Sequence, residues 1–381
     1  MYAVAAGLGR FFLFSLALPC RAFMSGRFAK GVFQATEASF FCRIRFVFIF
    51  LNWSLGDGMK YRRFGRTGFD TADMAHGLWG MSGWTGSDDQ ESMDALQLAV
   101  DLGCNFFDTA WAYGEGKSDG LLGKTLADNS EKRLFAASKV PPMNRKWPAL
   151  PGYRYSDVFP AEHVFKYADM IRKQLSTDSI DLLQFHVWDD GWAELPEFRN
   201  TVEKLKKDGV IKFFGLSLNR WEPENGIKAM RTGLVDAVQV IYNIFDQAPE
   251  DELFPACKEL NVGVIARVPL DEGSLGGTLT KDTVFPKNDW RSIYFCKENL
   301  IPTVERVEKL KEDVPTGMTL PEMALRFVLS HPVVSTTIVG MRRLAHVRQN
   351  IAMSDAGALD AGLLAKLKPH RWDRRPTHWS E

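Results

Sequence analysis

The chain has 381 residues, of which 45% are apolar and 25% charged, so it is long and apolar enough to form a globular protein with a sizeable core. Basic and acidic residues number 47 each, and this zero net charge argues against nucleic acid or an anionic membrane as the partner. The five cysteines are widely spaced and odd in number, which predicts neither a disulfide framework nor a zinc site. We therefore expect a cytoplasmic protein whose partner is a small molecule.

Residues 1–58 differ from the rest of the chain. They contain six basic residues, but their only acidic residues are Glu37 and Asp57, and their two apolar runs are too short to span a bilayer. The interpretation that we favour is a start codon assigned too early, with the protein itself beginning at Met59. A targeting leader is the alternative, because acid-poor segments containing Arg and Ser are typical of leaders.

From Met59 onward, short apolar runs that indicate strands alternate with amphipathic runs that indicate helices, as in parallel α/β folds. After a short hairpin at 60–68, strands are expected at 72–80, 104–110, 133–140, 180–188, 211–218, 237–243, 262–270 and 334–340. Helices are expected to follow them at 88–103, 118–128, 161–175, 193–209, 223–233, 250–261, 321–330 and 342–352. This order predicts one (β/α)8 TIM barrel over residues 59–381.

Four ionisable side chains lie at or just beyond the ends of three consecutive predicted strands. Asp108 and Tyr113 follow the second strand, Lys139 ends the third, and His186 lies near the end of the fourth. The carboxyl ends of barrel strands converge on one face, where the active sites of this fold lie. The sequence therefore predicts that the four side chains meet in one pocket.

These side chains suit the reduction of a carbonyl group. A phenol is a weak acid at neutral pH, but the ammonium group of Lys139 is expected to lower the pKa of Tyr113, with Asp108 keeping Lys139 charged. Tyr113 is then a general acid for the carbonyl oxygen, and His186 can orient and polarise that oxygen. A cofactor would supply the hydride.

The segments "FFDTAWAYGEGKSDGLLG" and "DLLQFHVW", together with Lys139, resemble the aldo-keto reductase family, whose catalytic tetrad is Asp, Tyr, Lys and His. The resemblance extends from about Lys60 to Ala352 and includes "GLSLNR", "QVIYNIFDQ", "ARVPLDEGSLGG" and "IVGMRR". It implies that Asp108, Tyr113, Lys139 and His186 are the catalytic residues. It also implies a nicotinamide cofactor that lies across the barrel mouth.

On this resemblance, Ser217, Asn219 and Gln239 would bind the carboxamide, and the backbone at Gly273, Ser274 and Leu275 would bind the pyrophosphate. The adenosine end would lie against Gly340, Arg342, Arg343 and Asn350. A guanidinium beside a helix N-terminus suits a 2′-phosphate, which favours NADP(H). Arg267 stands where many family members have a tyrosine that stacks on the nicotinamide, so the stacking partner is expected to be the plane of this guanidinium or to be absent.

Trp79, Trp111 and Trp188 follow strand ends and are candidates for the substrate pocket, with packing at the barrel rim as the alternative role. Two other functions remain open at this point. Some family members resemble non-catalytic regulatory subunits of membrane channels that bind the nicotinamide cofactor. A metal-dependent barrel hydrolase would need several His or carboxylate ligands at strand ends, where the sequence offers only His186 and Asp108.

Overall fold

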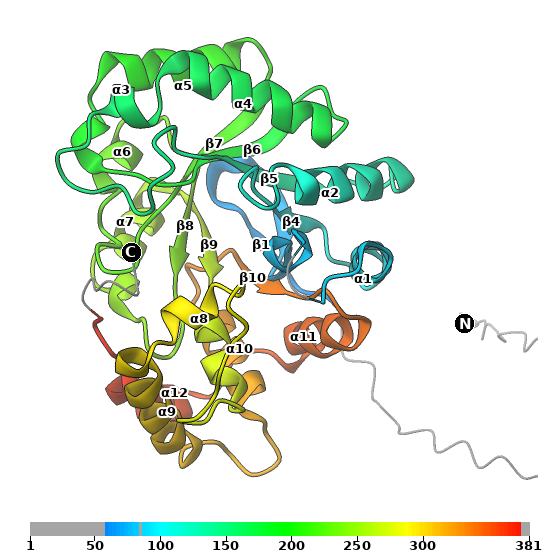
Figure 1. Cartoon of the computed structure of the whole chain (residues 1–381), viewed down its shortest axis with the longest axis vertical. Coiled ribbons are helices and arrows are strands. Elements are labelled where there is room, and N and C mark those ends of the chain that lie inside the picture. Colours follow the sequence, from blue (N-terminus) through cyan, green and yellow to red (C-terminus); the bar gives the residue numbers. More distant parts are fainter. Residues whose placement is uncertain (1–57, 84–85, 375–381) are drawn as a thin grey trace, which may run out of the picture. The chain divides into compact units, whose positions relative to one another are not determined.

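The computed structural model describes residues 58–83 and 86–374, so the expectation for residues 1–57 concerns a segment outside the described residues. Eight parallel strands close into a barrel in the order β10-β3-β4-β5-β6-β7-β8-β9 (Figure 1). They are Met74–Gly77 (β3), Phe106–Asp108 (β4), Phe135–Val140 (β5), Ile180–Phe185 (β6), Ile211–Ser217 (β7), Ala237–Ile241 (β8), Gly263–Arg267 (β9) and Thr336–Gly340 (β10). Each lies within one predicted strand, and the predicted (β/α)8 barrel is confirmed.

Helices follow all eight barrel strands, as the amphipathic runs predicted. They are Asp89–Asp101 (α1), Lys117–Asp128 (α2), Ala161–Gln174 (α4), Pro196–Lys207 (α5), Ile227–Arg231 (α6), Leu253–Leu260 (α7), Leu320–Ser330 (α10) and Leu344–Ala356 (α11). Side-chain caps define some of the helix starts. Asp88 accepts a hydrogen bond of 2.8 Å from the backbone N–H of Glu91 at the start of α1.

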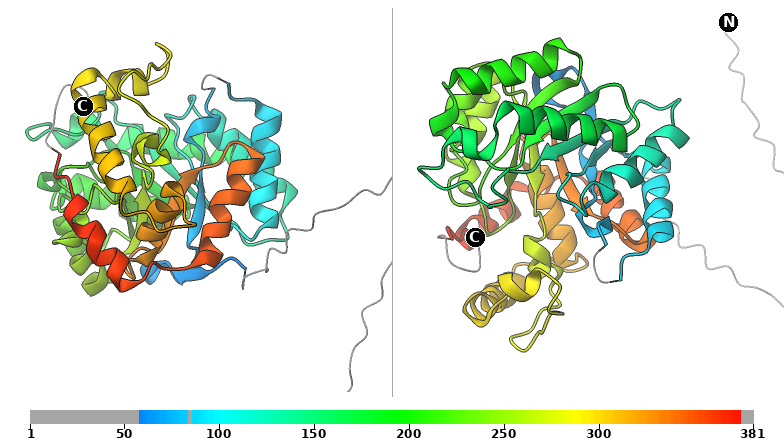
Figure 2. Two further views of the ribbon diagram at one scale, coloured as in Figure 1. Left: turned by 90° about the horizontal axis from the view of Figure 1, so that it is seen from below. Right: turned by 45° about the horizontal axis from the view of Figure 1, so that its top comes forward.

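Further helices lie in segments that the sequence analysis did not assign. They are Tyr155–Val158 (α3), Arg291–Tyr294 (α8), Lys297–Lys311 (α9) and Ala361–Leu367 (α12). Helices α8 and α9 belong to the long connection after β9 and project from one side of the barrel (Figure 2). The sequence of α9 contains Pro302, a residue that normally interrupts a helix, and this weakens the local helical signal.

An N-terminal hairpin is present as predicted, but it extends to Ala72, beyond the predicted range 60–68, and it closes one end of the barrel. Strand Tyr61–Arg63 (β1) pairs antiparallel with Asp70–Ala72 (β2). Between them, the fully buried ring of Phe64 lies edge-on to Phe106, with ring centroids 5.3 Å apart. Gly65, which follows, is required because a Cβ atom there would lie 2.3 Å from the backbone nitrogen of Gly263. The hairpin therefore leaves the opposite end of the barrel, where the strands terminate, as the open mouth.

The alternation of side chains along the strands determines which residues reach that mouth. Inside the barrel lies a small apolar cluster that includes Phe106, Phe135, Leu182, Ala237 and Ile265. Moving along each strand from this cluster in steps of two residues leads to the polar side chains Asp108, Lys139, Gln184, Gln239 and Arg267. The intervening residues, such as Phe107, Leu183 and Val240, instead join the larger core between the barrel and its helices.

Candidate active site

Asp108 and Lys139 form a buried ion pair at the ends of β4 and β5. Lys139 Nζ donates to Asp108 Oδ1 at 2.5 Å and to the carbonyl oxygen of Thr109 at 2.7 Å. The two side chains are 1% and 0% exposed. Two charges so far from water are stable only when they are paired and their remaining hydrogen-bonding capacity is used.

Two glutamines inside the barrel donate hydrogen bonds to the second carboxylate oxygen of Asp108. Gln239 Nε2 on β8 donates to Asp108 Oδ2 at 2.7 Å, and Gln184 Nε2 on β6 donates to the same atom at 3.3 Å. The amide nitrogen of Gln239, predicted to bind the cofactor carboxamide, is thus used to orient Asp108. Gln184 was not predicted as a site residue, because a single Gln in an apolar run does not show which way its side chain points.

Burial and charge act in opposite directions on Lys139. Burial lowers its pKa, but the negative charge of Asp108, the interaction with Tyr113 and hydrogen bonds to both residues raise the pKa by more. The net pKa of Lys139 is above its ordinary value. Lys139 is therefore a permanent positive charge at this site.

Tyr113 lies in the turn after β4, with the centre of its ring 5.1 Å from Lys139 Nζ. Burial raises the pKa of Tyr113, and this outweighs the lowering by Lys139. The prediction that Lys139 would lower the pKa of this phenol below its ordinary value is therefore wrong in its net direction. The physical reason is desolvation, which disfavours the phenolate. Tyr113 keeps its proton at neutral pH, as a general acid must.

The turn that carries Tyr113 depends on glycine. Gly114 and Gly116 have φ angles of +69° and +89°, a region that side chains other than glycine rarely occupy. A Cβ atom on Gly116 would lie 2.7 Å from the ring of Trp111. These glycines let the chain reverse within a few residues and enter α2 at Lys117, leaving Tyr113 beside the strand ends.

His186 follows β6 and completes the group. Its ring centroid is 5.9 Å from that of Tyr113, and its backbone N–H donates to the carbonyl oxygen of Val140. Burial, with the charges of Lys139 and Arg267, brings the pKa of His186 well below its ordinary value, so its ring is neutral at neutral pH. Among the described residues, Nδ1 has no hydrogen-bond partner. The structure thus brings together all four residues predicted for the tetrad.

The three predicted pocket tryptophans have different surroundings. The ring centroid of Trp79 is 6.4 Å from that of Tyr113, and Trp79 is 38% exposed. Trp111 and Trp188 are instead buried in the core, where Trp188 packs on Phe198 and donates to Asp190. These two tryptophans have the packing role that was the alternative in the sequence analysis.

Two tryptophans that the sequence analysis did not select lie close to the tetrad. The ring centroid of Trp147 is 5.7 Å from that of His186, and Trp290 is 6.3 Å from Trp79. Trp147 belongs to the long connection after β5 and Trp290 to the one after β9. A connection of unusual length after a strand that carries a site residue was the available signal for both.

The residues predicted to hold the nicotinamide lie at neighbouring strand ends. Ser217 ends β7 and is 5% exposed, and Gln239 pairs with it in the strand register. Asn219 has a different local role, because its Oδ1 accepts from the backbone N–H of Glu222 at 2.9 Å and its Nδ2 contacts the Glu222 carboxylate at 3.4 Å. Its side chain stabilises the turn after β7.

The connection after β9 has an unusual backbone. Val268, Asp271 and Glu272 have φ angles of 56°, 45° and 54°, and Gly273 follows at 100°. A positive φ at a β-branched residue such as Val268 is a marked outlier, and such strain is concentrated at functional sites. The N–H groups of Gly273 and Leu275 both donate to the Leu270 carbonyl oxygen, and Ser274 lies inside the 3-10 helix Asp271–Gly276. The three residues predicted to bind the pyrophosphate thus lie together in this connection.

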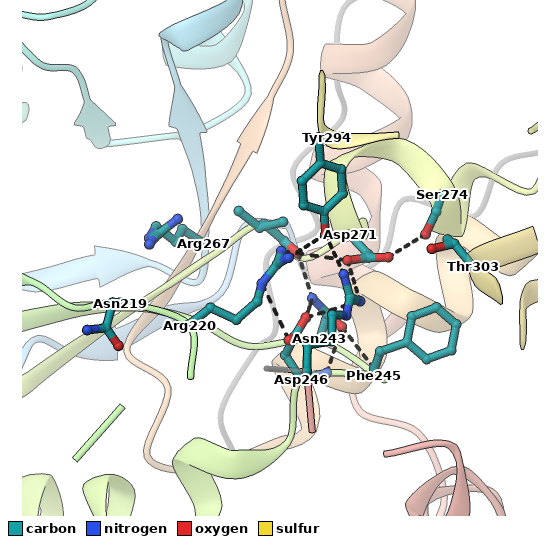
Figure 3. A network of polar contacts seen from close by, with 12 residues as sticks. Asn219, Arg220, Asn243, Phe245, Asp246, Arg267, Asp271, Ser274, Tyr294 and Thr303 are labelled. Atoms are coloured by element: carbon teal, nitrogen blue, oxygen red, sulfur yellow. Dashed lines mark hydrogen bonds and ion pairs between the residues drawn. The ribbon is translucent and has the colours of Figure 1, made fainter. Parts of the chain in front are cut away.

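A buried ionic network anchors this connection (Figure 3). Arg374 Nη2, in the C-terminal segment, lies 2.7 Å from Asp271 Oδ1, and Ser274 Oγ donates to Asp271 Oδ2 at 2.6 Å. Arg220 lies 3.5 Å from Asp246 and 3.7 Å from Asp271. The Tyr294 hydroxyl accepts from both arginines. Burial raises the pKa of Asp271, but Arg374 and Arg220 lower it by more, so this carboxylate stays charged.

The residues predicted for the adenosine end lie at β10 and α11. Gly340 ends β10, Arg342 is half-buried, Arg343 is exposed at the start of α11, and Asn350 is half-buried within it. The pKa of Asp289 is raised by burial but lowered more by Arg291, with a contribution from Arg342. The connection after β9 and the start of α11 therefore lie close together.

A (β/α)8 barrel with an Asp–Lys ion pair, a tyrosine and a neutral histidine at its mouth is the architecture of a class of barrel oxidoreductases. The sequence model of the aldo/keto reductase family matches residues 73–370. The chain belongs to the aldo/keto reductase family, whose members use nicotinamide cofactors.

Individual relatives differ in their cofactor. The chain is 26% identical over 320 residues to the NADH-specific methylglyoxal reductase of Escherichia coli, covering 80% of this chain and 96% of the relative. It is 27% identical over 305 residues to the Schizosaccharomyces pombe aldo-keto reductase yakc, named for NADP(+), covering 76% and 88%. The glycerol dehydrogenase structure from Gluconobacter oxydans superposes with a TM-score of 0.67 at 25% identity, covering 81% of this chain and 94% of that one.

Two other features bear on the expected partners. Within residues 58–83 and 86–374, every helix is too short or too polar to span a bilayer. In the same residues, no three His, Cys, Asp or Glu side chains are grouped so that they could hold a metal ion.

Proposed function

We propose that this protein reduces an aldehyde or ketone to an alcohol, or catalyses the reverse reaction, with NADP(H). The observation that best supports the proposal is the buried Asp108–Lys139 pair beneath Tyr113, with the neutral ring of His186 beside it. When bound, the nicotinamide supplies or accepts the hydride. Ser217, the connection around Ser274, and Arg342 are the parts of the chain that we propose to hold the cofactor, and Gln239 contributes by orienting Asp108.

In this proposal Tyr113 donates its proton to the carbonyl oxygen as the carbonyl carbon gains the hydride. The charge of Lys139 stabilises the phenolate that remains, and Asp108 keeps Lys139 in place and charged. His186 orients the carbonyl oxygen through a ring nitrogen. Trp79, Trp147 and Trp290 provide apolar walls for the substrate.

The choice of NADP(H) over NAD(H) depends on Arg342 at the start of α11, because a guanidinium near a helix N-terminus favours a phosphate group. The relatives include both an NADH-specific enzyme and one named for NADP(+). Titrating the full chain with NADPH and with NADH, for wild type and Arg342→Gln, tests the choice. We expect Arg342→Gln to weaken NADPH and leave NADH unchanged.

The test of the activity follows the loss of NADPH absorbance with a panel of aliphatic and aromatic aldehydes and ketones. We expect turnover by the wild type and a fall of about 10²- to 10⁴-fold in Tyr113→Phe, which lacks the proton donor. Tyr167→Phe is the matched control, because the Tyr167 hydroxyl contacts Arg145 outside the tetrad. Equal rates in Tyr113→Phe and the wild type would contradict the role of Tyr113. NADPH binding without turnover across the panel would contradict the reductase.

A further inference from the structure

Arg267 ends β9, and its guanidinium reaches across the mouth of the barrel. Its Nη2 donates at 3.0 Å to the carbonyl oxygen of Leu218, the residue after β7. Because β8 lies between β7 and β9 in the barrel, the side chain must pass over the end of β8. The guanidinium therefore lies beside the strand ends that carry Ser217 and Gln239, where the nicotinamide is proposed to bind.

The charge of Arg267 also acts on the tetrad. Burial has the largest influence on the pKa of Tyr113 and of His186, and the positive charge of Arg267 contributes a lowering to both. In turn, the charges of Tyr113 and Asp108 contribute a raising of the pKa of Arg267. The guanidinium is thus close enough to the reacting groups to interact electrostatically with a ligand bound between them.

The arginine charges around the mouth are compensated to different extents. Arg220 and Arg374 share the carboxylates of Asp246 and Asp271, whereas the guanidinium of Arg267 is directed away from this network (Figure 3). Within the described residues, Arg267 Nε is buried without a hydrogen-bond partner. Among acidic side chains, Glu272 has the largest effect on the pKa of Arg267, and burial raises the pKa of Glu272 itself. A guanidinium remains protonated even in such surroundings.

The two redox forms of nicotinamide differ by one charge on the ring, which would lie near this guanidinium if the cofactor binds as proposed. Reduction of a carbonyl transfers a hydride to the carbonyl carbon while the oxygen takes the proton of Tyr113, and the ring that has lost the hydride becomes a cation. A neutral aromatic side chain tolerates either form, but a fixed cation at short range repels the oxidised ring. Salt weakens this repulsion less than it would between fully exposed charges, because Arg267 is only partly accessible to water.

We propose that Arg267 makes the site bind reduced nicotinamide more tightly than oxidised nicotinamide, and so favours carbonyl reduction over alcohol oxidation. The inference rests on the proposed function and adds the direction of the reaction that the site favours. In this inference, Arg267 both contacts the cofactor and discriminates between the reduced and the oxidised nicotinamide.

The test compares the dissociation constants of NADPH and NADP+ for the full chain, measured by quenching of tryptophan fluorescence. The ratio of the two constants is informative, because contacts with the pyrophosphate and the adenosine are common to both forms and cancel. We expect Arg267→Gln, which removes the charge and keeps a polar amide, to reduce the preference for NADPH by about tenfold, or about 1.4 kcal/mol. Arg267→Lys, which keeps the charge, should retain most of the preference.

Arg342→Gln is the matched control, since it removes a cation from the adenosine end and should weaken both forms by similar factors. An unchanged ratio in Arg267→Gln overturns the inference and leaves the proposed function standing. If Arg267→Gln does not fold, Arg267→Met provides the same comparison. If the wild type binds neither NADPH nor NADP+, the same measurement is made with NADH and NAD+. A wild type that binds none of these four forms overturns the proposed function together with this inference.

Discussion

Ser138 Oγ donates a hydrogen bond of 2.8 Å to Asp119 Oδ1 on the outer face of the barrel, directly behind Lys139. Ser138 precedes Lys139 on β5, so the alternation of the strand sends one side chain outward to α2 and the other inward to Asp108. Asp119 and Ser138 are both fully buried. A second carboxyl group, outside the predicted tetrad, therefore supports the strand that carries Lys139.

Asp119 is expected to make stability depend on pH. Burial raises its pKa from 3.8 to about 7, despite the hydrogen bond from Ser138 that lowers it. Because the pKa is higher in the folded than in the unfolded state, the folded protein binds more protons in this interval and loses stability as the pH rises through it. Asp119→Asn removes this dependence. We expect its stability relative to the wild type to increase by about 2–4 kcal/mol between pH 4 and pH 8.

Urea unfolding of the wild type and of Asp119→Asn at the two pH values measures this difference. Ser138→Ala is a useful companion, because it removes the hydrogen bond and leaves the buried carboxyl group. A difference between wild type and Asp119→Asn that does not change with pH would contradict the assignment.

Removing one partner of the Asp108–Lys139 pair should cost more than removing both. Lys139→Met leaves a buried carboxylate without its cation, which is expected to destabilise the fold by about 3–5 kcal/mol. In the double variant Asp108→Asn with Lys139→Met no charge is left uncompensated, so part of the stability should return. Chemical denaturation of both variants measures the effect, and a double variant no more stable than Lys139→Met would refute the explanation.

His186 is expected to act as a neutral hydrogen-bonding group throughout the physiological range. Its pKa lies well below the ordinary value, so the pH profile of kcat/KM should show no inflection from this residue near pH 6.5. His186→Asn should lower kcat by about 10²- to 10³-fold if His186 polarises the carbonyl oxygen. A wild-type inflection near pH 6.5 that disappears in His186→Asn would show instead that the histidine becomes charged.

Arg374 is expected to affect cofactor binding from outside the cofactor site. Its side chain is 2% exposed and holds Asp271, which in turn accepts from Ser274. Arg374→Met should reduce stability by about 2–4 kcal/mol, because it weakens the compensation of a buried carboxylate, and should weaken NADPH binding. Arg371→Met is the control, since Arg371 pairs with the exposed Asp251. Thermal unfolding and NADPH titration of the two variants should separate them, and similar behaviour of both would contradict the role of Arg374.

The fold could be predicted largely from local patterns. Most barrel strands lie in mainly apolar runs, each followed in the chain by an amphipathic helix, and both signals are contained in short windows of sequence. Helices α8, α9 and α12 were not predicted. They belong to no strand-helix unit, and α9 carries Pro302 within it.

The tetrad was also accessible from the sequence, because position at a strand end is enough to bring Asp108, Lys139 and His186 to one face. Gln184, Trp147 and Trp290 were missed. Their roles depend on which side chains from other connections they meet, and no spacing within a short segment carries that information. Trp111 and Trp188 have the packing role that was the alternative to the substrate pocket, since Trp188 packs on Trp192 and Phe198 and Trp111 on Tyr167.

The sequence by itself determined the barrel and the residues that the strand alternation sends to its mouth, because these follow from local periodicity. Only the tertiary structure decided how charge and burial balance there. The pKa of Tyr113 rises because desolvation outweighs Lys139, and Asp271 stays charged because Arg220 and Arg374 reach it from far along the chain. Such balances depend on distance in space and on access of water, and neither quantity is contained in the order of residues along the chain.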